Sequence, residues 1–152
     1  QMTWPGAPTV YYGDEAGVCG FTDPDNRRTY PWGHEDKELI DFHKAAIKMH
    51  KENEVLRTGS YKQLYSAHNV IAYGRFTSDD AVIVVVNNGE DEIRVNIPAW
   101  ETGLAMDDDV EQIMVTFEGG YSTDRQGYRL KDGILNIGLR KTSATVLRRL
   151  RW

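Results

Sequence analysis

Hydrophobic residues recur at two different periods along this chain, and the change of period divides it near residue 56. Before that point the main signal is a set of apolar positions spaced three and four residues apart, namely Leu39, Phe42, Ala46 and Met49. This spacing predicts an amphipathic helix over about residues 36–51, with Asp36 as its N-cap. From Ser60 onward apolar and polar residues alternate, which predicts β-strands.

The alternating region predicts about eight short strands separated by turn residues. They cover Tyr61–Tyr65, Val70–Phe76, Ala81–Val86, Ile93–Ile97, Ile113–Phe117, Tyr128–Leu130, Leu135–Leu139 and Ala144–Leu147. The third is apolar at every position and is expected in the centre of its sheet, and Asp132-Gly133 predicts a hairpin turn between the sixth and the seventh. The pattern favours an antiparallel, Greek-key-like β-sandwich with one core.

The segment before the helix combines a short apolar run with a loop rich in turn-forming residues. Thr9–Tyr12 is β-branched and aromatic, is bounded by proline and glycine, and predicts a short strand buried on both faces. Two acids, Asp14 and Glu15, follow at once. Residues 13–33 then show no sustained periodicity, and an ordered loop of this kind is usually functional.

Two motifs stand in this part of the chain. They are Gly6-x-Pro8-x-Val10-Tyr11-Tyr12-Gly13-x-Glu15, and Asp23-Pro24-Asp25-Asn26-Arg27-Arg28 followed by Pro31-Trp32. Together they resemble the end of the catalytic barrel in the α-amylase family of glycoside hydrolases, in its neopullulanase, cyclomaltodextrinase and α-glucosidase branch. The resemblance implies that residues 1–55 are the last strand, loop and helix of a truncated (β/α)8 barrel, and that residues 56–152 form a C-terminal β-sandwich. It also implies a parent enzyme that cleaves α-glucosidic bonds of starch-like or maltodextrin substrates with retention, through a covalent glycosyl-enzyme.

Asp23 and Arg27 are the candidate substrate-binding residues. A carboxylate accepts hydrogen bonds and a guanidinium donates them, so the two side chains on one proline-stiffened loop can satisfy both roles of a sugar hydroxyl. In the family that the motif resembles, this loop contacts the sugar on the non-reducing side of the cleavage point, which implies that role for both residues. From spacing alone, the alternative is an Asp-Pro turn with a local salt bridge.

No catalytic residue is assigned within the chain. Asp14 and Glu15 are adjacent on a strand end and would point in opposite directions, so they are poorly placed to act as the two carboxyl groups of glycoside hydrolysis. Tyr12, Gly13 and Glu15 are expected to shape the barrel mouth instead. In the family resembled here, the catalytic acids come from earlier barrel strands, so we expect this fragment to be inactive and mainly structural. A chain that begins at Gln1, just before a strand, is expected to be truncated, and any targeting segment would precede it.

The sequence predicts no metal site and no cofactor. Asp23-x-Asp25 begins like a calcium loop, but Arg27 and Arg28 stand where a ligand and a glycine belong. The histidines have no metal-binding spacing, Cys19 is the only cysteine, and Asp107–Asp109 predicts a solvated acidic loop.

Composition and charge narrow the range of partners. The net charge of −5 argues against nucleic acid, because phosphate binding needs concentrated lysine and arginine. The one basic group, Arg148, Arg149 and Arg151, is expected to be solvated, and no apolar run approaches the ~18 residues of a membrane span. The resemblance implies that the partner of the parent enzyme is an α-glucan or maltodextrin. Without its barrel neighbours, Thr9–Tyr12 is expected to seek another sheet edge, so residues 1–35 should be disordered, pack irregularly on the sandwich or exchange between copies.

Two other functions stay open at this point. One is a self-sufficient sugar-binding β-sandwich, which aromatic side chains gathered on one sheet face would support. Trp32 and Trp100 are candidates for stacking on sugar rings, although core packing is the more common role of tryptophan. The other is a purely structural domain that stabilises its barrel and binds nothing alone.

Overall fold

A computed structural model describes residues 1–150, which contain two α-helices and nine β-strands. The helices are α1 (Lys37–Glu52) and α2 (Val55–Thr58). The strands are β1 (Ser60–Ala67), β2 (Val70–Phe76), β3 (Ala81–Asn87), β4 (Ile93–Pro98), β5 (Asp109–Phe117), β6 (Gly120–Ser122), β7 (Gln126–Arg129), β8 (Ile134–Leu139) and β9 (Ser143–Arg149). Short 3₁₀ helices cover Asp14–Ala16, Asp25–Arg27 and Ala99–Thr102. No helix in the described part of the chain is long and apolar enough to cross a membrane.

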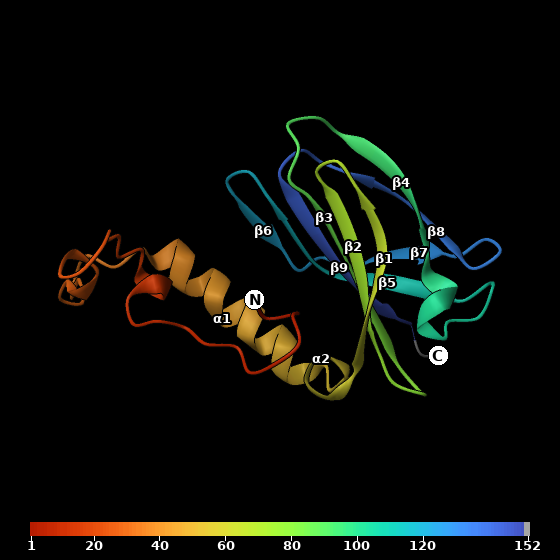
Figure 1. Ribbon diagram of the computed structural model, residues 1–152, viewed down its shortest axis with the longest axis horizontal. Coiled ribbons are helices and arrows are strands. Elements are labelled where there is room, and N and C mark those ends of the chain that lie inside the picture. The colour runs from red at the N-terminus through yellow and green to blue at the C-terminus, as the bar shows by residue number, and fades with distance from the viewer. Residues whose placement is uncertain (151–152) are drawn as a thin grey trace.

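The strands build two antiparallel sheets, with helices on the side opposite the smaller sheet (Figure 1). The larger sheet has seven strands in the order β1-β2-β3-β9-β5-β6, with β7 also paired to β5. The smaller sheet consists of β4 and β8 and covers one face of the larger one. Side chains from α1 and α2 pack on the other face. The mainly β, antiparallel fold class expected from the sequence is confirmed.

Strand β3 lies between β2 and β9, in the interior of the larger sheet, as its continuous apolar sequence predicted. Its alternate side chains enter different clusters. Ile83 and Val85 pack with the apolar residues of β4 and β8, whereas Val82 and Val84 pack with those of the helices. The expectation of one core is therefore wrong. The larger sheet is buried on both faces, so it separates two cores.

Helix α1 begins one residue later than predicted and has the predicted N-cap. Oδ1 of Asp36 accepts a hydrogen bond from the Leu39 amide at 2.9 Å, which satisfies a backbone donor that the first turn leaves free. Helix α2 then places Leu56, which is fully buried, against the sheet. At Gly59 a Cβ atom would lie only 2.4 Å from the Val55 carbonyl oxygen, so glycine is required where the helix passes into β1.

The predicted strand Thr9–Tyr12 is wrong. Residues 7–11 have no regular secondary structure, and Val10, Tyr11 and Tyr12 are exposed. A strand needs a neighbour for its backbone N–H and C=O groups, and within residues 1–150 no strand pairs with this segment. The residues of this segment favour a strand, but the described structure offers no neighbouring strand to pair with them.

The predicted hairpin around Asp132-Gly133 is also wrong, although its turn forms. Asp132 and Gly133 have positive φ angles of 52° and 75°, and a single bridge joins Lys131 to Ile134. The flanking strands nevertheless pair elsewhere, β7 with β5 and β8 with β4. The apolar side chains of β8 enter the core between the sheets, so this strand belongs to the smaller sheet.

The first residues of the chain are fixed to both the helix and the larger sheet. The Thr3 hydroxyl shares a 2.6 Å hydrogen bond with the hydroxyl of Tyr73, and the Thr3 carbonyl accepts from Nη1 of Arg75 at 3.2 Å. Nδ1 of His50 lies 2.6 Å from the Met2 carbonyl oxygen. Burial raises the pKa of Tyr73 and lowers that of Arg75. We call this group of contacts the N-terminal anchor.

Candidate functional site

The loop that carries Asp23 and Arg27 is held by the residues next to them. Asp25 accepts from the Phe21 amide at 3.0 Å and from Nε of Arg28 at 2.8 Å. The hydrogen bond from Arg28 lowers the pKa of the Asp25 carboxyl. The Tyr12 hydroxyl donates to the Arg28 carbonyl at 2.9 Å, which ties the loop to the segment before it.

Gly20 allows the two arms of this loop to touch. A Cβ atom at this position would lie 2.8 Å from Cα of Asn26 and 2.8 Å from the Asp25 carbonyl oxygen. Both neighbours are backbone atoms, which cannot move away as a side chain can. The close approach brings the turn at Asp25–Arg27 back against the segment that precedes it.

Asp23 and Arg27 lie together, as their spacing predicted. Nε and Nη2 of Arg27 donate to the two carboxylate oxygens of Asp23, each at 3.2 Å. The side chains of Arg27 and Asp23 are 69% and 63% exposed. An exposed ion pair of this kind contributes about 0–1 kcal/mol to stability, so the pair does little to hold the loop. The local salt bridge therefore forms, and it leaves both side chains accessible to a ligand.

Exposed aromatic rings occur within this loop and elsewhere on the surface. Phe21 is 84% exposed and Trp32 is 79% exposed, and the Trp32 ring lies 4.5 Å from that of Tyr30 between centroids. Trp100 is 48% exposed, where it covers Gly133 at the end of the smaller sheet. Core packing, the more common role of tryptophan, is therefore wrong for both Trp32 and Trp100, since both side chains are largely exposed.

Asp14 and Glu15 do not form a pair of carboxyl groups facing one site. Both belong to the 3₁₀ helix Asp14–Ala16, and Oε2 of Glu15 accepts from the Gly13 amide at 3.0 Å. Gly13 has a φ of 92°, which favours glycine, and a Cβ atom here would clash with the Val18 side chain. Glu15 thus supports a local turn in this structure.

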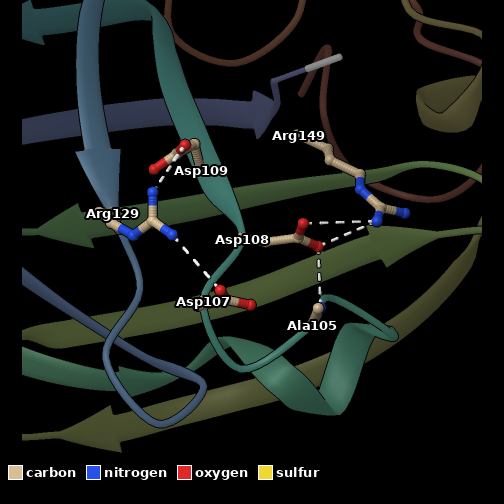
Figure 2. A network of polar contacts seen from close by, with 6 residues as sticks. All are labelled: Ala105, Asp107, Asp108, Asp109, Arg129 and Arg149. Atoms are coloured by element: carbon tan, nitrogen blue, oxygen red, sulfur yellow. Dashed lines mark hydrogen bonds and ion pairs between the residues drawn. The ribbon is translucent and has the colours of Figure 1, made fainter. Parts of the chain in front are cut away.

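The acidic run Asp107–Asp109 is paired with arginines (Figure 2), while the Asp107 side chain stays 80% exposed, as expected of a solvated loop. Arg129 bridges Asp107 and Asp109 at 3.3 and 3.4 Å, and Arg149 contacts Asp108 at 3.0 Å. The Ala105 amide also donates to Asp108 at 2.8 Å. The acids meet these arginines because β7 and β9 both pair with the beginning of β5.

The basic group near the end of the chain is neutralised in the same way, which corrects its assignment as solvated. Arg148 contacts Glu111 at 2.6 Å across the sheet, while Arg149 uses Asp108. Arg151 lies outside the described residues. Among residues 1–150, no group of three or more His, Cys, Asp or Glu side chains is arranged to hold a metal ion.

Comparisons with known proteins relate this chain to amylopullulanases and cyclomaltodextrinases, although no family model matches it. It is 46% identical over 101 residues to an amylopullulanase of Thermoanaerobacter thermohydrosulfuricus, covering 59% of this chain and 7% of that protein. It is 42% identical over 90 residues to a cyclomaltodextrinase of Thermoanaerobacter pseudethanolicus, covering 58% of this chain and 16% of that protein. The chain thus spans only a small part of these relatives. In fold it resembles an α-amylase from Geobacillus thermoleovorans, with a TM-score of 0.82, 24% identity, and coverage of 99% of this chain and 31% of that one.

Proposed function

Because this chain belongs to the α-amylase family of glycoside hydrolases, we propose that it is part of an enzyme that hydrolyses α-glucosidic bonds in starch-like or maltodextrin substrates. Residues 1–55 supply the end of the catalytic barrel with its substrate loop, and residues 56–152 supply the C-terminal β-sandwich. The reaction proceeds with retention, on carboxylates from other strands of the barrel. The names of the relatives, amylopullulanase and cyclomaltodextrinase, support α-glucan as the substrate class.

The accessibility of the Asp23–Arg27 pair carries this proposal. Arg27 uses Nε and Nη2 on Asp23, and its Nη1 has no partner among the described residues. A sugar hydroxyl that approaches the pair can donate to the carboxylate and accept from Nη1 at the same time. The contacts of Asp25 with the Phe21 amide and of Tyr12 with the Arg28 carbonyl hold the loop, so Asp23 and Arg27 can turn toward a ligand while the loop keeps its shape.

The chain by itself is expected to hydrolyse no α-glucan. Retaining hydrolysis needs two carboxyl groups about 5–5.5 Å apart on either side of the scissile bond. The acids of the loop region are engaged in other contacts, Asp23 with Arg27, Asp25 with Arg28, and Glu15 with the Gly13 amide. This region therefore binds and orients sugar, while the chemistry belongs to other residues of the parent enzyme.

A chimera tests the proposal. This chain replaces the matching segment of the Thermoanaerobacter pseudethanolicus cyclomaltodextrinase, and kcat/KM is measured with maltodextrins. Arg27→Ala should lower kcat/KM about tenfold or more, chiefly through KM, because it removes a charged hydrogen-bond donor from bound sugar. Arg94→Ala, at an exposed arginine on β4, is the matched control and should leave kcat/KM unchanged.

Two results would contradict this assignment. One is an Arg27→Ala chimera as active as its parent chimera, and the other is a folded chimera without activity.

Self-association of the chain is a separate prediction, which light scattering measures. Because residues 9–12 form no strand within one copy, association by strand pairing would require them to become one.

A further inference from the structure

Trp4, Tyr61 and Tyr73 form an aromatic cluster on the larger sheet. The ring centroid of Trp4 lies 5.1 Å from that of Tyr61 and 5.3 Å from that of Tyr73. The rings of Tyr61 and Tyr73 are 5.5 Å apart. The planes of Trp4 and Tyr61 are inclined by 59°, a tilted arrangement that aromatic pairs favour. Tyr61 and Tyr73 stand on neighbouring strands and Trp4 on the segment before the helix, so the three rings gather on one face of the sheet, as would support a sugar-binding sandwich.

The three rings differ in their exposure to solvent. Tyr73 is only 6% exposed and forms the base of the cluster, against the side chains that pack with α1. Trp4 is 49% exposed and Tyr61 is 37% exposed. The cluster therefore has a buried base and two open rings, which we call the Trp4–Tyr61 platform.

The N-terminal anchor fixes the platform in place. The Thr3 hydroxyl is bonded to Tyr73, and the Thr3 carbonyl is bonded to Arg75, so the backbone directly before Trp4 is held at two points. Tyr61 stands on β1, which is paired with β2 along its length. Rings that are fixed before binding lose little conformational entropy when a ligand arrives.

Each open ring also carries a polar group for hydrogen bonding. The indole N–H of Trp4 and the hydroxyl of Tyr61 have no hydrogen-bond partner among the described residues. A hollow of about 300 Å³ lies beside the Trp4 ring and is lined by Gln1 and residues 4–9. Aromatic rings with an accessible polar tip recur where one ligand presents both apolar and polar surfaces.

We infer that the Trp4–Tyr61 platform is a glucan-binding site separate from the Asp23–Arg27 loop. A glucosyl ring has C–H groups on its faces and hydroxyls on its rim, so it stacks on an aromatic ring while the rim reaches the indole N–H and the phenol. Successive units of an α-linked glucan are not coplanar, and the rings of Trp4 and Tyr61, inclined by 59°, are not coplanar either. The choice of α-glucan as ligand rests on the proposed function.

The experiment titrates maltoheptaose into the whole chain, with isothermal calorimetry for affinity and two-dimensional ¹H–¹⁵N spectra for location. We expect the indole N–H signal of Trp4 to shift on binding, and Tyr61→Ala to weaken binding at this site about tenfold. Tyr61→Phe keeps the ring and removes only the hydroxyl, so it should weaken binding less. Trp4→Ala should abolish binding at the platform. Because this change can also disturb the neighbouring N-terminal anchor, the Tyr61 variants provide the independent test.

Trp100→Ala is the matched control, because Trp100 is 48% exposed, close to the value for Trp4, and has no ring neighbour among the described residues. It should leave the Trp4 shift unchanged. The inference is overturned if the Trp4 signal does not move, or if Tyr61→Ala binds as the natural sequence does. Binding lost only in Arg27→Ala overturns the platform and leaves the proposed function standing. A Trp4 shift that persists, with a chimera insensitive to Arg27→Ala, supports the platform and removes the loop assignment.

Discussion

Replacing Leu56 by alanine tests whether the helices and the sandwich fold as one unit. Leu56 is fully buried on α2, where it packs with Met49 of α1 and with Tyr73 and Val82 of the larger sheet. The side chain therefore connects the helical layer to the sheet. If both layers depend on the same contacts, removing this side chain should destabilise both together.

The magnitude follows from the burial of the side chain. A buried Leu→Ala change lowers the free energy of unfolding by about 2–5 kcal/mol, through lost transfer energy and the cavity that remains. A value of about 3 kcal/mol corresponds to a drop of roughly 6–12 °C in Tm for a chain of this size. Leu135→Ala makes the same change on β8, at a residue that is also fully buried but lies in the opposite core. It should give a drop of similar size.

Urea unfolding measures both effects, with far-UV circular dichroism reporting α1 and near-UV circular dichroism reporting aromatic packing. The two signals should give one transition in each variant, at lower urea and with an unchanged m-value. The reasoning is refuted if Leu56→Ala separates the signals into two transitions, or shifts the helical signal alone. That result would mean that the shared sheet does not couple its two faces.

Three further changes test the loop and the helix. Gly20→Ala should push a Cβ atom against the Asn26 backbone and weaken Arg27-dependent maltodextrin binding in calorimetry, whereas Gly127→Ala, which meets no atom within 4 Å, should have no effect. The pKa of Asp25 lies below its ordinary value of 3.8, so its contribution to loop order is present above pH 3.8 and is lost as pH falls through the lowered pKa. An NMR titration of this carboxyl should show the pKa rising toward 3.8 in Arg28→Gln, and an unchanged pKa would count against the contact. Asp36→Ala should lower the free energy of unfolding by about 1 kcal/mol in urea titrations, and equal stability would exclude a capping role.

The sequence predicts local elements well where side-chain period and capping chemistry coincide. Helix α1 has both signals, an apolar stripe and the Asp36 cap, and it forms within one residue of the expected bounds. The continuous apolar run of β3 likewise identifies an interior strand, because only a strand covered on both faces can bury every side chain. The pairing of Asp23 with Arg27 also follows from spacing on a short turn.

Long-range pairing is the part that local sequence does not determine. Nothing around Asp132-Gly133 distinguishes a hairpin from a turn whose strands join different sheets, because both need the same turn residues and the same alternation. Thr9–Tyr12 has strand composition but no neighbouring strand among the described residues. The platform was missed for a related reason. Trp4 and Tyr61 are far apart in the sequence, and the contacts of the N-terminal anchor bring them together.

The N-terminal anchor has a consequence for the conformational entropy of the loop that carries Asp23 and Arg27. With Thr3 fixed to the sheet and α1 packed on the same sheet, the intervening residues are a closed loop that is tethered at both ends. Closing a loop lowers chain entropy once, by an amount that grows only with the logarithm of its length. Contacts within this loop, such as that of Tyr12 with Arg28, then form in a segment whose two ends are already fixed, so they cost less conformational entropy. The β-sandwich thereby reduces the conformational freedom of the loop that carries Asp23 and Arg27.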